Sequence, residues 1–162
     1  MTVSHRARRV RLLCVDVDGV LTDAGMYYGP DGEVLKKFNT RDGMGLARVR
    51  QVGVAVAIIS GEDSAIVHAR AAKLKIDEVF SGVANKVDIV KDLITSHNLI
   101  PDEVAYIGDD LNDLPAMDLV GLPCAVADAA DPIKDAARYV TRRRGGDGAV
   151  REVCELIIAA KL

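Results

Sequence analysis

The stretch Val10-Arg11-Leu12-Leu13-Cys14-Val15-Asp16-Val17-Asp18-Gly19 decides the fold class. Its first six residues are mostly apolar, as in a strand buried on both faces, and they run directly into two aspartates. Residues 54–59 and 104–107 have the same form, and they end at Ser60-Gly61 and at Gly108-Asp109-Asp110. Because the carboxyl ends of parallel strands share one edge of a sheet, we expect these polar segments to converge.

The rest of the chain alternates helical and strand patterns. Turn residues at 29–32 separate apolar segments at 26–28 and 34–38, which predicts a protruding hairpin. Short connections between strands and helices predict an α/β fold: a doubly wound, Rossmann-like, mainly parallel sheet with helices on both faces. Helices are expected at residues 42–51, 63–74, 86–97, 111–117 and 149–160, one more starts at Asp131-Pro132, and a short strand is expected at 78–80.

Composition narrows the class of protein. A length of 162 residues predicts one domain, and 49% hydrophobic residues with only 4% aromatics predict an aliphatic core. The net charge of −3 gives no global field that would attract nucleic acid, and no apolar run is long enough for a membrane span. Cys14, Cys124 and Cys154 each lie in an apolar stretch, which favours a reducing compartment. We therefore expect a cytoplasmic protein with no nucleic-acid or membrane partner.

Carboxylates gathered at one sheet edge repel one another, and such a cluster persists when a cation occupies it or some carboxylates are protonated. Asp16, Asp18, Asp109 and Asp110 form the expected cluster. Oxygen ligands favour a hard divalent ion, and Mg²⁺ also accepts a phosphate oxygen. Cys14 is interpreted as a buried strand residue and no imidazole lies nearby in the sequence, so Zn²⁺ is disfavoured. The pattern therefore favours a Mg²⁺ site at this edge of the sheet.

These residues resemble the four ordered motifs of the haloacid dehalogenase superfamily. Within it the chain is similar to the capless 3-deoxy-D-manno-octulosonate 8-phosphate phosphatase family, which includes relatives that act on nonulosonate 9-phosphates. The resemblance covers residues 10–156. It rests on DVDGVLTD at 16–23, SG at 60–61, NK at 85–86 and GDDLND at 108–113, and on RDGMGL at 41–46, AVADA at 125–129 and GGDGAVRE at 145–152.

The resemblance implies an enzyme, a phosphoric monoester hydrolase that acts on a 2-keto-3-deoxy sugar acid phosphate and feeds cell-surface polysaccharide synthesis. Asp16 would be the nucleophile that forms an aspartyl-phosphate. Asp18 would protonate the leaving oxygen and then activate water as a base. The expected Mg²⁺ ligands are Asp109, the Asp16 carboxylate and the backbone carbonyl of Asp18.

The remaining motif residues receive supporting roles from the same resemblance. The Ser60 hydroxyl and the Gly61 N–H are expected to hold phosphoryl oxygens, and Lys86 is expected to neutralise charge that the metal leaves uncovered. Asp110 and Asp113 are expected to orient waters or Lys86 from outside the first layer of contacts.

Three residues are candidates for binding the sugar. Eight-carbon phosphatases of the family commonly carry Arg where this chain has Glu62, whereas nine-carbon relatives have Glu there and a Lys that matches Lys73. At about 100° per residue, Glu62 and Lys73 share one side of a helix if the helix is continuous. Arg70 offers a guanidinium for the substrate carboxylate. The alternative for Arg70 and Lys73 is a solvated helix face.

The segments between the motifs leave no room for a cap domain, so the whole of residues 1–162 is expected to be one phosphatase domain. An open site needs a cover, and a neighbouring subunit can supply it. The resemblance implies a homotetramer in which the hairpin at about 24–38 and the tail at 142–162 serve as assembly elements. Ordinary packing within one subunit is the alternative for the hairpin aromatics, and a solvated basic patch is the alternative for residues 142–144.

Three other functions stay open. An uncapped site suits a sugar phosphatase of broad specificity. A phospho-accepting module that resembles response-regulator receivers also places acidic residues and a Lys at strand ends, although the Asp-x-Asp spacing of Asp16 and Asp18 argues against it. An inactive oligomerisation partner is the third, and the presence of every expected catalytic residue disfavours it.

Overall fold

A computed structural model describes residues 1–162 and has a six-stranded sheet in the order β5-β4-β1-β6-β7-β8, with every neighbouring pair parallel. The strands are β1 (Leu12–Val15), β4 (Ala55–Ile59), β5 (Glu78–Phe80), β6 (Val104–Gly108), β7 (Leu122–Ala125) and β8 (Tyr139–Val140). All four residues of β1 are buried because β1 lies between β4 and β6 and helices cover both faces.

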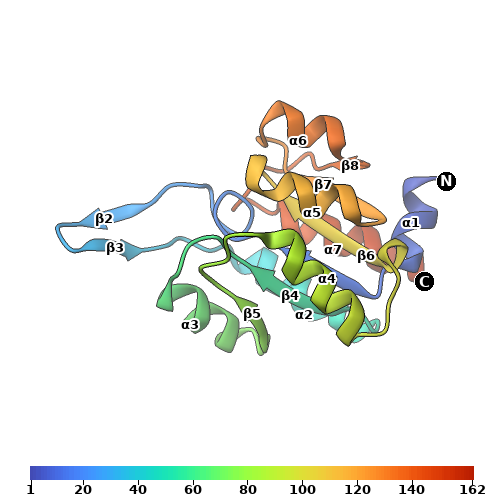
Figure 1. Cartoon of the computed structure of the whole chain (residues 1–162), viewed down its shortest axis with the longest axis horizontal. Coiled ribbons are helices and arrows are strands. Elements are labelled where there is room, and N and C mark those ends of the chain that lie inside the picture. The colour runs from blue at the N-terminus through green and yellow to red at the C-terminus, as the bar shows by residue number, and fades with distance from the viewer.

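Helices pack on both sides of the sheet (Figure 1). In the view of Figure 1, α4 and α5 lie in front of the sheet, and α2 and α7 lie behind it. The fold class is therefore confirmed as doubly wound α/β. The helices are α1 (Val3–Arg9), α2 (Thr40–Gln51), α3 (Ala65–Lys73), α4 (Lys86–Ser96), α5 (Leu114–Leu119), α6 (Asp131–Ala136) and α7 (Ala149–Lys161), with 3₁₀ turns η1 (Pro101–Glu103) and η2 (Leu111–Asp113).

The core is aliphatic, as the composition predicts. It contains 40 buried hydrophobic residues, and Tyr106 is the only aromatic side chain among them. None of the helices is both long and apolar enough to cross a bilayer.

The hairpin consists of β2 (Tyr27–Gly29) and β3 (Gly32–Leu35), paired antiparallel and separate from the main sheet. It projects away from the sheet as an isolated arm (Figure 1). Tyr28 and Leu35 are exposed by 66% and 59%, although apolar side chains of this size are usually buried. The arm therefore offers an apolar surface that nothing in its own chain covers.

Several elements differ from the sequence expectation. Helix α1 and strands β7 and β8 were not predicted. Strand β7 contains Pro123, which is unusual within a strand, and β8 has only two residues. The helix expected at 111–117 is divided into η2 and α5, because Asp110 caps the 3₁₀ turn before the α-helix begins. Helix α3 begins at Ala65, after Glu62, so the shared helical side expected for Glu62 and Lys73 is wrong.

The C-terminal segment packs on its own chain. Asp42 of α2 is buried, and its Oδ1 accepts a hydrogen bond at 2.9 Å from the backbone N–H of Arg151 in the first turn of α7. This contact caps α7 across two elements. Its Oδ2 has no partner, and burial raises the pKa of Asp42. The helical part of the expected assembly tail is therefore a structural helix of the same subunit.

Candidate active site

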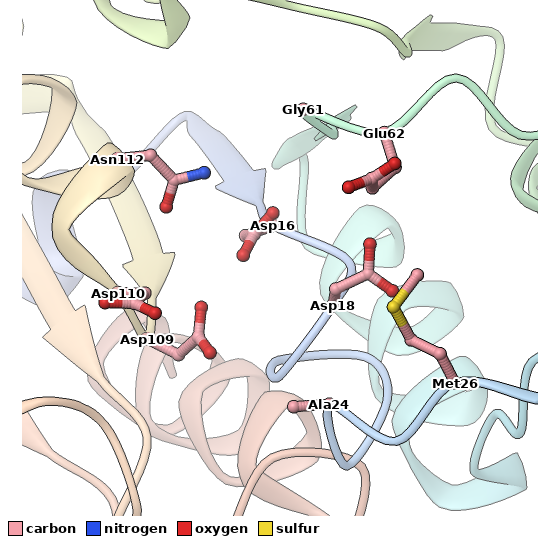
Figure 2. A pocket seen from close by; sticks show the side chains of 9 residues that line it. All are labelled: Asp16, Asp18, Ala24, Met26, Gly61, Glu62, Asp109, Asp110 and Asn112. Carbon is pink, nitrogen blue, oxygen red and sulfur yellow. The ribbon is translucent and has the colours of Figure 1, made fainter.

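The polar segments after β1, β4 and β6 converge on one cavity of about 220 Å³ at the carboxyl edge of the sheet. This follows from the strand order, because β1 pairs with β4 on one side and with β6 on the other. Figure 2 shows the residues that line the cavity: Asp16, Asp18, Ala24, Met26, Gly61, Glu62, Asp109, Asp110 and Asn112.

A buried lysine lies directly behind the cavity. Lys86, the first residue of α4, donates from Nζ to Oδ1 of Asp16 at 2.7 Å and to Oδ1 of Asp113 at 2.8 Å. All three side chains are at most 6% exposed. An ammonium at a helix N-terminus is unfavourable to the helix dipole, so its partners must supply the compensation. The pKa of Lys86 is raised: burial lowers it, but the two carboxylates outweigh burial.

Asp113 uses both of its oxygens within the protein. Besides Lys86, its Oδ1 accepts the hydroxyl of Tyr106 at 2.6 Å. Its Oδ2 accepts the backbone N–H groups of Asp109 at 2.9 Å and of Asp110 at 3.3 Å. A carboxylate engaged in this way has little capacity left for an ion. Asp113 therefore holds Lys86 and the loop after β6 in place.

The remaining negative charge can take a divalent cation. Asp16, Asp109 and Asp113 each offer an oxygen within 4.8 Å of the others. Three carboxylates and the one ammonium of Lys86 leave two negative charges without a partner, which equals the charge of one Mg²⁺. Since Asp113 is fully engaged, Asp16 and Asp109 are the carboxylates free to bind it, and Figure 2 shows the Asp109 carboxylate pointing toward Asp16.

The pKa values of Asp16 and Asp109 reflect that excess of negative charge. Burial, followed by the charge of Asp113, raises the pKa of Asp16 well above its usual range, although Lys86 acts in the opposite direction. Burial, together with the charges of Asp113 and Asp110, raises the pKa of Asp109 to about 6, although a hydrogen bond with Asp16 lowers it. A bound cation would favour the ionised forms of both.

Asp18 faces a different set of partners from Asp16. In Figure 2 its carboxylate extends toward Glu62 and Met26, whereas Asp109 lies on the far side of Asp16. Its Oδ1 accepts a hydrogen bond at 2.6 Å from Nζ of Lys36, which also donates to Oε2 of Glu33 at 2.9 Å. The nucleophile candidate and the acid candidate are thus each held by their own lysine.

The second motif, Ser60-Gly61, exposes the backbone of Gly61 to the cavity, whereas the Ser60 side chain is buried. Ser60 is fully buried, and its Oγ accepts the N–H of Glu62 at 3.3 Å. Gly61 and Glu62 line the cavity itself. The expected phosphoryl contacts of the Ser60 hydroxyl and the Gly61 N–H stay predictions, with Gly61 the more accessible of the two.

Two glycines let the loop after β1 fit between its neighbours. Gly19 has φ +86°, and a Cβ there would overlap the Asp109 carboxylate. On the other side of the loop, a Cβ at Gly145 would overlap the carbonyl oxygen of Gly19. The N–H of Gly146 donates to the Val20 carbonyl at 2.9 Å. The glycine-rich segment 145–148 therefore packs against the Asp16–Asp18 loop of its own chain, and its role in assembly stays a prediction.

The three sugar-binding candidates do not lie together within one chain. Glu62 is in the cavity, whereas the Arg70 guanidinium lies over the Phe38 ring, 5.6 Å from its centroid. Lys73 lines a separate hollow with Arg50 and Leu74. Their proposed role in binding the sugar therefore requires a substrate or subunit that bridges these places.

No role was predicted for Lys36 and Tyr106 from the sequence, yet both contact predicted site residues. Tyr106 lies on β6 two residues before Gly108, in a strand read only as core. Lys36 lies at the foot of the hairpin, outside the quoted motifs: it is 13 residues after the motif at 16–23 and five before the one at 41–46. The residues around Lys36 in the sequence do not indicate that its ammonium is buried, because only the folded hairpin brings it to Asp18. His68 and His97 instead contact Ser81 and Glu78, outside the cavity.

Known proteins resemble this chain over the segments that carry these site residues. A haloacid dehalogenase-like hydrolase family model matches residues 58–153. The 3-deoxy-D-manno-octulosonate 8-phosphate phosphatase of Escherichia coli K12 is 47% identical over 159 residues, covering 98% of this chain and 85% of that protein. The Yersinia pestis enzyme of the same name superposes with a TM-score of 0.95 at 46% identity, covering 98% of this chain and 86% of the other.

The chain belongs to the 3-deoxy-D-manno-octulosonate 8-phosphate phosphatase family. It is therefore a phosphoric monoester hydrolase of the haloacid dehalogenase superfamily. A family structure from Moraxella catarrhalis, determined with a magnesium ion, a phosphate ion and a KDO molecule, has a TM-score of 0.94 and 38% identity, covering 98% of this chain and 91% of the other.

We predict that Gly19→Ala lowers phosphatase turnover by about 100-fold, because its Cβ displaces the Asp109 carboxylate and the loop that carries Asp16 and Asp18. Gly53→Ala is the matched control: its φ of +82° imposes similar backbone strain, but no atom lies within 4 Å of the new Cβ. Both variants should lose about 1 kcal/mol of stability from strain, and only Gly19→Ala should lose turnover as well. Equal turnover in the two variants would contradict this packing argument.

Proposed function

We propose that this phosphatase hydrolyses 3-deoxy-D-manno-octulosonate 8-phosphate in the presence of Mg²⁺. The observation that carries the proposal is the pair of uncompensated carboxylate charges beside buried Lys86, at the opening of a cavity lined by Asp16, Asp18 and Asp109. Two positive groups, the cation and Lys86, then allow a mildly acidic protein to accept a phosphate. The identity with eight-carbon phosphatases favours this substrate over a nonulosonate 9-phosphate, which the Glu62 position would suit.

In this proposal Asp16 attacks phosphorus. Lys86 holds Oδ1 of Asp16, which leaves the other oxygen to form the bond. As the O–P bond to Asp16 forms, the bond from phosphorus to the sugar oxygen breaks, and Asp18 gives that oxygen its proton. Asp18 then takes a proton from the water that attacks the aspartyl-phosphate, releasing phosphate and restoring Asp16.

Mg²⁺ would be held by the carboxylates of Asp16 and Asp109 and by the backbone carbonyl of Asp18, where it supplies charge neutralisation for the phosphoryl oxygens. The N–H of Gly61 is proposed to hold another phosphoryl oxygen. Asp113 orients Lys86, and Asp110 caps the adjacent 3₁₀ turn by accepting the N–H of Leu111 at 2.8 Å.

The proposed functional unit is a homo-oligomer, with a tetramer as the expected form, of single-domain subunits that comprise residues 1–162. Met26, Tyr27, Tyr28, Val34 and Leu35 leave an apolar surface on a two-stranded arm, and an isolated hairpin is marginal in water. Since α7 is buried within its own chain, the assembly proposal rests on the hairpin rather than on residues 149–161. A cytoplasmic location and a supply role in cell-surface polysaccharide synthesis belong to the same proposal.

The open cavity also suits a broad-specificity sugar phosphatase, and a substrate panel separates the two functions. With Mg²⁺ present, we expect turnover of 3-deoxy-D-manno-octulosonate 8-phosphate to exceed that of hexose phosphates by at least about 100-fold, since a positioned sugar acid gains contacts in the transition state. A nonulosonate 9-phosphate is the third arm. The measurement is phosphate release under steady-state conditions.

Asp16→Asn should abolish turnover in that assay while leaving the fold intact, because the amide keeps the shape of Asp16 and loses its nucleophilic charge. Similar rates on all sugar phosphates would instead support broad specificity. No turnover of any ester by a folded sample would contradict the proposed function, and retained activity of Asp16→Asn would contradict the assigned nucleophile.

Stabilisation by Mg²⁺ should increase with pH. The pKa of Asp109 is raised to about 6 in the metal-free protein, so its ionisation opposes folding. This penalty is absent below its ordinary pKa of 3.8 and complete above about 6. Mg²⁺ binds the ionised form and removes the penalty, so the rise in Tm on adding Mg²⁺ should be larger at about pH 7.5 than at about pH 5.

Thermal unfolding followed by circular dichroism measures that rise. Asp109→Asn removes one of the two free carboxylates and should lose most of the Mg²⁺-dependent rise at both pH values. A rise in Tm that is equal at the two pH values in the wild-type protein would contradict the assignment of Asp109 as a ligand.

A further inference from the structure

A second buried lysine, Lys36, lies at the foot of the hairpin, directly after β3. Its side chain is 0% exposed. An ammonium that is removed from water needs charged partners to compensate for the lost hydration. Lys36 does not line the cavity, so a direct contact with the substrate does not account for its burial. The reason must lie in the groups it contacts.

Those groups are two carboxylates from different parts of the chain. The ammonium donates to Oδ1 of Asp18 at 2.6 Å and to Oε2 of Glu33 at 2.9 Å. The other oxygen of Glu33 accepts the hydroxyl of Ser64, at the start of α3, at 3.4 Å. One row of contacts thus connects the hairpin, the loop after β1 and the segment after the second motif.

The arrangement is asymmetric at Asp18. Lys36 contacts Oδ1 of Asp18, and no other side chain donates a hydrogen bond to Asp18. The Asp18 side chain keeps 25% exposure toward the cavity. Lys36 therefore fixes one oxygen, and the other accepts no hydrogen bond in a carboxylate that lines the cavity.

We propose that Lys36 is a positioning residue for the reaction: it fixes Oδ1 of Asp18 so that Oδ2 is the atom that exchanges a proton with the leaving oxygen. Glu33 holds Lys36 in turn, so the position of the Asp18 carboxyl group depends on the position of the hairpin. This inference rests on the proposed function, since it requires Asp18 to act as the acid.

The chemistry gives Lys36 a specific signature. As the phosphorus–oxygen bond to the sugar breaks and the bond to Asp16 forms, a strongly basic sugar alkoxide needs the Asp18 proton. The p-nitrophenolate of p-nitrophenyl phosphate leaves without one, because it is a weak base. Loss of the positioning contact should therefore slow phosphoryl transfer to Asp16 far more from the sugar ester than from the activated ester. Hydrolysis of the aspartyl-phosphate, in which Asp18 acts as the base, is common to both esters.

The test compares Lys36→Met with Lys37→Met. Lys37 is the adjacent residue, its side chain is 64% exposed, and it pairs with Asp23 outside the cavity at 3.5 Å. With enzyme in excess, single-turnover release of the leaving group reports the first step alone. For Lys36→Met we expect this rate on 3-deoxy-D-manno-octulosonate 8-phosphate to fall by about 10- to 100-fold, with the half-saturating concentration within about threefold. The same rate on p-nitrophenyl phosphate should fall by less than about threefold. Lys37→Met should match the wild type on both esters.

Glu33→Gln is the second variant, and it keeps the test decisive if Lys36→Met fails to fold. It leaves Lys36 in place and removes one of its charged anchors, so we expect a smaller fall in the single-turnover rate with the same dependence on the leaving group. Equal losses in the single-turnover rates on the two esters, a rise in the half-saturating concentration that accounts for the loss on the sugar ester, or unchanged rates would overturn the inference. Failure of the wild-type enzyme on the sugar ester would instead contradict the proposed function.

Discussion

The structure depends on one buried ion-pair arrangement, in which Lys86 bridges Asp16, directly after β1, and Asp113, in the η2 turn that follows β6. Unpaired, each of these charges would cost several kcal/mol in the interior. Together they join two neighbouring strands to the start of α4, with contacts of 2.7 and 2.8 Å. One ammonium cannot balance the charges of all the nearby carboxylates. The same arrangement therefore leaves an excess of negative charge that a divalent cation can balance.

A second lysine holds the other aspartate of the loop in the same way, from the opposite side of the site. Lys86 holds Asp16 from within the sheet, and Lys36 holds Asp18 from the hairpin. Two aspartates that are two residues apart on one loop are thereby anchored to different parts of the molecule. Gly19 and Gly145 allow that loop to lie between Asp109 and the C-terminal tail. A short chain without a cap domain can in this way give two chemically similar groups distinct surroundings.

The sequence predicted what short-range patterns encode. Apolar runs that end in aspartates located β1 and β6, and the convergence of their ends followed from parallel topology. Long-range contacts carried no such signal. Lys36 is 18 residues from Asp18, and its charge alone could equally indicate solvent exposure. Strand β7 was missed because Pro123 breaks the usual strand pattern, and its place between β6 and β8 is set by tertiary packing.

The central claim is that this arrangement makes Asp16 a nucleophile. The most direct measurement is rapid acid quenching of the enzyme during turnover of ³²P-labelled 3-deoxy-D-manno-octulosonate 8-phosphate, followed by peptide mapping. The account predicts an acid-stable, hydroxylamine-sensitive label on the peptide that contains Asp16, formed and lost at rates compatible with turnover. Label on a peptide without Asp16, or turnover with no labelled protein at any quench time, would contradict it.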